Sequence, residues 1–180
     1  MPLLLALALL SATPTQAIQK RFAQAGDLEE AGNFHDVQLN SVLPAVGAQT
    51  RSVRFIHRSE QEDPERNPYA MKHELVKVVV SYFVAASAEI RTEYLFDARG
   101  ELVFHFAREG GVDGFRATRI YFDGGSPYRV LVDTGDSDAP ERKTFTTLTA
   151  DQKKRAKSLR KWARRYSKAF EALVAVEAAQ

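Results

Sequence analysis

The segment Thr149–Val176, with the sequence TADQKKRAKSLRKWARRYSKAFEALVAV, predicts a long amphipathic helix near the C-terminus of the 180-residue chain. On a helical wheel of 3.6 residues per turn, its apolar and small side chains gather on one arc. They are Ala156, Leu159, Trp162, Ala163, Tyr166, Phe170, Leu173 and Val174. Thr149, followed three residues later by Gln152, fits a capping box that begins a helix. We therefore expect residues 149–178 to be a basic amphipathic helix that packs its apolar arc on the rest of the domain.

The opposite arc of this helix is almost purely cationic. Surface helices usually mix charges, because like charges four residues apart destabilise a helix by a few tenths of a kcal/mol. The candidates for an anion-binding site are Lys157, Arg160, Lys161, Arg164, Arg165 and Lys168. A face that is merely solvated is the alternative.

Charge is polarised along the chain. Of 25 basic and 23 acidic residues, nine basic and three acidic ones lie in residues 151–180, which leaves 16 basic and 20 acidic residues for the rest. Either the acidic remainder of the domain or an anion from outside must offset the crowded cations.

Residues 1–17 have the outline of a secretory signal peptide. Pro2–Leu10 is a run of apolar and small residues too short to span a bilayer, and Thr15-Gln16-Ala17 has small residues where a signal peptidase needs them. We expect cleavage after Ala17 and export to the periplasm or the extracellular space. Residues 18–180 then form a single domain without a transmembrane segment.

Between the termini, alternating apolar residues predict antiparallel strands. Ile18–Glu30 is a short helix in this interpretation, and Ser59–Asn67 and Asp133–Arg142 are polar loops. Strands are expected at Asp36–Leu43, Thr50–Arg58, Lys72–Ala85, Arg91–Asp97 and Ala117–Asp123, and around Phe104 and Val130. In the strongest strand, Val76 shares a face with Val78, and Leu75 shares the other face with Val79.

The predicted fold class is α+β. An antiparallel β-meander of about six to seven strands is covered on one face by the long C-terminal helix, which gives both apolar surfaces a partner. The alternative is a half-barrel whose helix is a lid over an apolar ligand.

Few residues point to a reaction. There is no cysteine, which excludes disulfides and thiolate chemistry. The histidines lack short-range zinc spacing, although His57 and His73 would face each other if the strands around Ser59–Asn67 pair. Val130–Gly135 resembles the active-site signature of the aspartic proteases over six residues only. That family shares two such aspartates across two lobes or two subunits. A single-lobe member also needs a flap hairpin and a later apolar strand with glycine, whereas most of the 45 residues after the motif are a basic helix. No metal or cofactor is expected.

We therefore expect a non-catalytic binding or interaction module of the cell envelope. Its partner would be an anionic envelope component or a protein, and not nucleic acid, because an exported protein does not meet the chromosome. The rival hypotheses are a small hydrolase that uses a carboxylate or histidine such as Asp133 or His57, and a half-barrel carrier of an apolar ligand.

Overall fold

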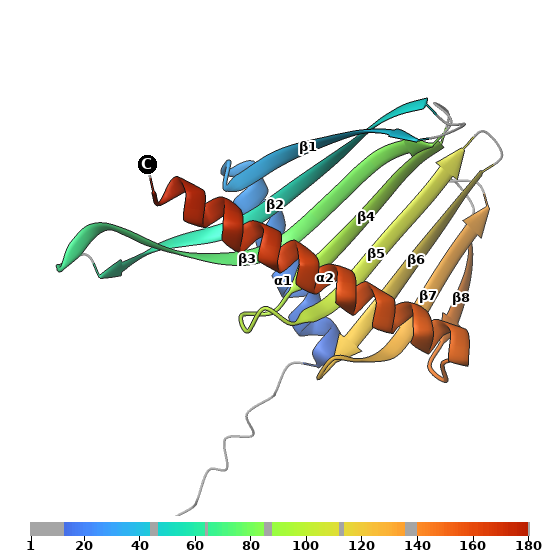
Figure 1. Ribbon diagram of the computed structural model, residues 1–180. Coiled ribbons are helices and arrows are strands. Elements are labelled where there is room, and N and C mark those ends of the chain that lie inside the picture. Colours follow the sequence, from blue (N-terminus) through green and yellow to red (C-terminus); the bar gives the residue numbers. More distant parts are fainter. Residues whose placement is uncertain are drawn as a thin grey trace, which may run out of the picture.

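The computed structural model describes residues 13–43, 47–63, 65–84, 88–111, 114–135 and 140–179. Two helices lie on opposite faces of one sheet (Figure 1). Helix α1 (Pro14–Glu30) lies behind the sheet in this view, and helix α2 (Ala150–Glu177) crosses the front of it diagonally. The molecule therefore has three layers, with an apolar core on each side of the sheet.

In the described part of the chain, eight strands form this sheet, and their order in space is their order in the sequence. Every neighbouring pair is antiparallel. The strands are β1 (Phe34–Leu43), β2 (Gly47–Asp63), β3 (Asn67–Val84), β4 (Ala88–Phe96), β5 (Leu102–Gly111), β6 (Gly114–Asp123), β7 (Ser126–Gly135) and β8 (Glu141–Phe145). The predicted meander with a C-terminal helix packed on it is confirmed, with eight strands in place of six or seven.

Strand β8 accounts for the difference in number. The predicted loop Asp133–Arg142 is wrong at both ends, because Asp133 lies in β7, Arg142 lies in β8, and the two residues are paired. The sequence Glu-Arg-Lys-Thr-Phe of β8 has no apolar alternation. Its pairing rests on backbone hydrogen bonds to β7, which do not depend on side-chain polarity.

The predicted loop Ser59–Asn67 is also largely wrong. Strands β2 and β3 continue through most of it as a hairpin arm, which projects beyond the other strands (Figure 1). Ser59 pairs with His73, and Glu60 pairs with Lys72, so opposite charges face each other across the arm. The polar composition of these exposed strands is that of a loop, which is why the sequence predicted a loop here.

A β-bulge in the β2–β3 pair changes which residues of β3 share a face. Ile56 pairs with Lys77 and His57 pairs with Leu75, which leaves Val76 as the extra residue. Leu75 therefore joins Val78 in the core under α2, and Val76 faces α1. The predicted assignment of Leu75 and Val76 to faces is wrong for this reason.

Helix α2 packs on a row of side chains that crosses seven strands. The row is Phe55, Val78, Tyr94, His105, Ile120, Val130 and Phe145. Ala156, Ala163 and Phe170 of α2 are buried against this face, and the small side chains bring the helix axis close to the sheet. The predicted capping box of Thr149 and Gln152 is present. Of the predicted apolar arc, Trp162 alone remains 45% exposed.

Helix α1 begins four residues earlier than the predicted Ile18–Glu30, because Thr13 and Gln16 form a capping box and Pro14 occupies the first turn. Its buried residues Ile18 and Ala25 pack against Leu95 and Phe104 on the second face. Residues 1–12 lie outside the described residues. The expected cut after Ala17 falls within α1 and would remove its N-cap.

Candidate anion-binding site

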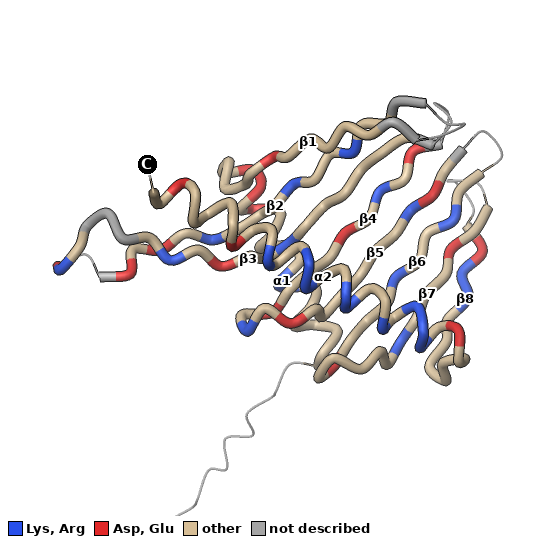
Figure 2. Tube along the Cα trace, viewed as in Figure 1, with Lys and Arg blue, Asp and Glu red and all other residues tan. Residues whose placement is uncertain are grey.

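The six candidate cations lie together on α2, five of them on its exposed side and Arg160 at the edge of that side. Figure 2 shows Lys and Arg recurring along this side of the helix. We call these residues the cationic face: Lys157, Arg160, Lys161, Arg164, Arg165 and Lys168. All six are exposed except Arg160, which is half-buried. Their spacing of three and four residues places their charged groups side by side over about three turns.

No carboxylate neutralises the cationic face. Among the residues that the structure describes, the ion pairs involve cations of α1, the strands and the β4–β5 turn, and none of the six is within ion-pair distance of an acid. On α2 itself, Glu177 is paired with His35 instead. The positive charge of this face is therefore exposed to solvent without internal compensation.

Two members of the cationic face are held in place by neighbours. A Cβ atom on Gly125 would lie 2.6 Å from Nη2 of Arg160, so this guanidinium rests on the open side of the glycine in the β6–β7 turn. The Arg165 guanidinium lies 4.7 Å above the ring of Trp162. The other four cations have no aromatic or acidic partner among the described residues.

Beside α2 lies a pocket of about 240 Å³ that the sequence did not predict. The helix contributes Trp162 and Tyr166, and the sheet contributes Arg51, Val80, Tyr82, Thr92 and Tyr94. The guanidinium of Arg51 lies 4.7 Å above the Tyr82 ring, and the rings of Tyr94 and Tyr166 are 5.2 Å apart. We call this the aromatic pocket.

Asp133, one of the two candidate catalytic residues, is fixed in ion pairs. Its side chain is 3% exposed and accepts hydrogen bonds from Nε of Arg142 at 2.7 Å and from Arg119. These guanidinium groups, that of Arg142 foremost, lower the pKa of Asp133 to about 2. A carboxylate so stabilised in its ionised form is a poor proton acceptor at neutral pH.

His57, the other candidate, belongs to a cluster of histidines beneath the C-terminal half of α2. The Ser59 hydroxyl lies 3.0 Å from Nδ1 of His57 and 2.9 Å from Nδ1 of His73, so the two rings do come together. The ring of His35 stacks on His57 at 4.6 Å, a neighbour that the sequence did not indicate. Burial, followed by the charges of the other two histidines, lowers the pKa of His57 to about 4. Phe170 covers the cluster.

The described residues of this cluster do not form a metal site. Among the described residues, no group of three or more His, Asp or Glu side chains is arranged to hold a metal ion. The nearby groove of about 440 Å³ is lined by His73 and Phe170, and not by Ser59 or His57. The cluster therefore packs the end of α2 on the sheet, and the buried imidazole of His57, with its pKa of about 4, is neutral at pH 7.

No protein-family model, curated protein or solved structure matches the chain. Neither of the described helices is apolar over enough of its length to cross a bilayer.

Proposed function

We propose that the protein is an exported, non-catalytic binding module that holds an anionic component of the cell envelope on its cationic face. The observation that carries this proposal is the absence of compensating acids. Six cations lie along one side of a helix, and none has an ion-pair partner among the described residues. A polyanion from outside the domain supplies the missing negative charge.

This arrangement has an energetic cost that a face of mixed charges would avoid. Like charges four residues apart, as in Lys157 with Lys161 or Arg164 with Lys168, destabilise a helix by about 0.2–0.5 kcal/mol per pair. Acids at alternate positions would remove this cost without loss of solubility. Selection for an anionic partner explains why the cations are kept together.

Export is part of the proposal and follows from the sequence of residues 1–17. An exported protein meets lipid headgroups, acidic polysaccharides and other envelope polymers. The hydrolase hypothesis receives less support. Asp133 is fixed by two arginines, and His57 lines neither the aromatic pocket nor the groove at His73 and Phe170.

Retention on a heparin column tests the proposal, with a variant in which Lys157, Lys161, Arg164 and Lys168 are changed to Gln. These four have no aromatic or acidic partner, so the fold should be unaffected. The natural chain should bind at low salt and elute as ionic strength rises, whereas the variant should pass through.

A matched control carries the same change of net charge on four exposed residues elsewhere, Lys20, Lys72, Arg116 and Lys143. This control should be retained almost as strongly as the natural chain. Equal loss in both variants would attribute binding to net charge alone, and no retention of the natural chain in low salt would refute the proposal.

A further inference from the structure

We infer that the aromatic pocket beside α2 is a binding site for a single acidic sugar unit, such as a uronic acid, of an anionic polysaccharide. This inference rests on the proposed function and specifies its ligand. It is carried by three features of the pocket: its size, the chemistry of its walls, and its position next to the cationic face.

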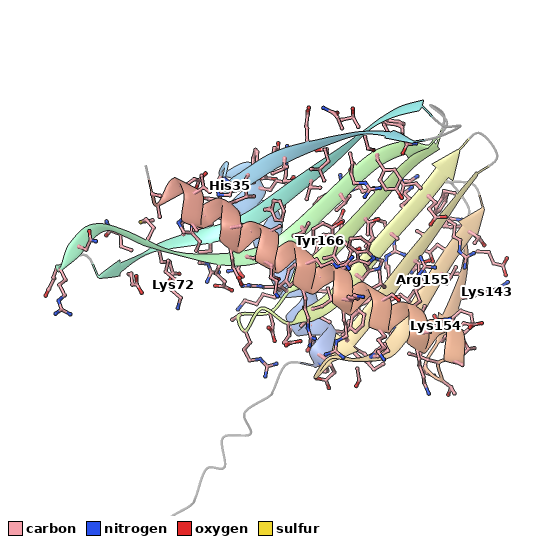
Figure 3. All side chains as sticks on the ribbon, in the orientation of Figure 1. His35, Lys72, Lys143, Lys154, Arg155 and Tyr166 are labelled. Carbon is pink, nitrogen blue, oxygen red and sulfur yellow. The ribbon has the colours of Figure 1, made fainter. Side chains whose placement is uncertain are left out.

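The size of the pocket suits one six-membered ring with its substituents. A cavity of 150 Å³ accommodates benzene, and the aromatic pocket has about 240 Å³. The pocket lies between α2 and strands β2, β3 and β4, because its lining residues come from these elements. Helix α2 crosses this face of the sheet diagonally (Figure 1). Figure 3 shows Tyr166 at this border between helix and sheet.

The walls combine flat apolar rings with hydroxyl groups. A pyranose ring has the same combination, because its C–H bonds form apolar patches and its hydroxyls lie around the rim. Tyr82, Tyr94 and Tyr166 all line the pocket, and the rings of Tyr94 and Tyr166 are 5.2 Å apart. Burial raises the pKa of the Tyr94 hydroxyl, and the neighbouring Tyr166 and Tyr82 raise it further. No hydrogen bond joins any of them to another described side chain. These hydroxyls are therefore free to bond a ligand, and sugar hydroxyls would provide the partners.

Arg51 makes the site specific for an acid. Arg51 is an exposed residue whose guanidinium lies over the Tyr82 ring and has no ion-pair partner among the described residues. A planar guanidinium at the mouth of an aromatic pocket can bind a carboxylate with two parallel hydrogen bonds. A neutral sugar would leave this charge unsatisfied.

The position of the pocket connects it to the cationic face. Trp162, 45% exposed, forms one wall of the pocket, and the guanidinium of Arg165 lies 4.7 Å above its ring. A chain of acidic sugars bound along the cationic face would therefore pass the pocket mouth. One unit of this chain would enter the pocket, and the cations of α2 would hold the units next to it.

Fluorescence gives a direct test, because Trp162 is the only tryptophan in the chain. A uronic acid trisaccharide is titrated against the natural chain, and the corresponding neutral trisaccharide serves as the comparison ligand. The acidic ligand should change the tryptophan emission in a saturable manner and bind at least about tenfold more tightly than the neutral one, as expected for a charge-assisted hydrogen bond.

Arg51→Gln should abolish this preference and leave the weak binding of the neutral sugar unchanged. Arg116→Gln is the matched control, because Arg116 is also an exposed arginine and lies in the same cross-strand row of the sheet as Arg51. The residues between them in this row are Tyr82, Ile90 and Glu109. It should bind the acidic trisaccharide like the natural chain. Tyr82→Phe, which keeps the ring and removes the hydroxyl, should weaken the binding of both sugars.

The outcomes separate this inference from the proposed function. An unchanged tryptophan emission, or equal affinity for acidic and neutral sugar, would overturn the inference even if the heparin column still retained the protein. Conversely, sugar binding without heparin retention would support the pocket and refute the cationic face as a binding surface. The variant with Lys157, Lys161, Arg164 and Lys168 changed to Gln should still bind the trisaccharide through the pocket, but more weakly, because fewer cations of α2 hold the neighbouring units.

Discussion

His105 lies in the middle of the sheet, in the core beneath α2. Its cross-strand neighbours are Tyr94 and Ile120, its side chain is 1% exposed, and neither ring nitrogen has a hydrogen-bond partner among the described residues. Burial, with a smaller effect from the charge of Arg155, lowers the pKa of His105 to about 3. The ring is therefore neutral in the folded protein over most of the acidic range.

His105 should make the protein less stable as the pH falls. Its pKa of about 3 in the folded state lies below the ordinary value of 6.5, so the unfolded chain takes up the proton first. Stability should fall below about pH 6.5 and continue to fall towards pH 3, by up to about 1.4 kcal/mol per pH unit for one such group. His57 acts in the same direction, down to its pKa of about 4.

Replacement of His105 by Leu should reduce this loss. The variant should also be more stable at pH 7, because it removes an unpaired polar group from the core. Urea unfolding at pH 7.5, 6.0 and 5.0 measures both effects. If His105→Leu lost as much stability between pH 7.5 and pH 5.0 as the natural chain does, His105 would not be a group that takes up a proton on unfolding.

Helix α2 approaches the sheet closely because its central contact residue is small. Ala163 is 2% exposed in the core, whereas Ala169 on the same helix faces solvent. Replacement of Ala163 by Leu should force the helix away from the sheet and cost about 1–3 kcal/mol.

Ala169→Leu is the matched control, because it adds the same side chain at an exposed position. It should change the free energy of unfolding by less than about 0.5 kcal/mol, measured by urea unfolding at pH 7.5. Equal effects of the two substitutions would mean that α2 does not pack on the sheet through this side.

The elements that the sequence predicted well are those with a strong apolar period. Ala156, Ala163 and Phe170 recur at helical spacing, and their burial followed directly from that period. Strand β8 and the β2–β3 arm lack such a signal, because polar strands are held by the backbone of their neighbours.

The aromatic pocket could not be predicted for a related reason. Arg51 and Tyr82 meet only through the register of β2 and β3, and they meet Trp162 only through the position of α2. Trp162 itself lies on the predicted apolar arc of α2, so the wheel assigned it to the core. The histidine pair His57 and His73 was predicted only on the condition that their strands pair. The cationic face needed no register, because all six residues lie on one helix.

The whole molecule has two cores of unequal size on the two faces of its sheet. The core under α2 extends from Val53 of β2 to Leu148, just before α2. The core under α1 is smaller, and α1 contributes only Ile18 and Ala25 as buried residues, together with ion pairs such as that of Arg21 with Glu74. We infer that α1 is the less firmly attached of the two helices.

Hydrogen exchange should reveal this difference. Amides in residues 18–30 should exchange faster than those of β4 and β5, because α1 can leave the sheet without exposing the larger core. Mass spectrometry of peptic peptides measures the exchange rates. Helix α2 is the internal comparison, because it has the same secondary structure as α1. Protection of α1 equal to that of β4 would indicate that both cores open together.

The sequential order of the strands has a consequence for how the chain acquires its structure during synthesis. Each strand finds its partner in the segment translated just before it, so hairpins can form as they leave the ribosome. The larger apolar face cannot be covered at that stage, because the helix that covers it is translated after all eight strands. Until residues 150–177 emerge, the nascent sheet exposes a wide apolar surface to the cell, which chaperones would have to shield.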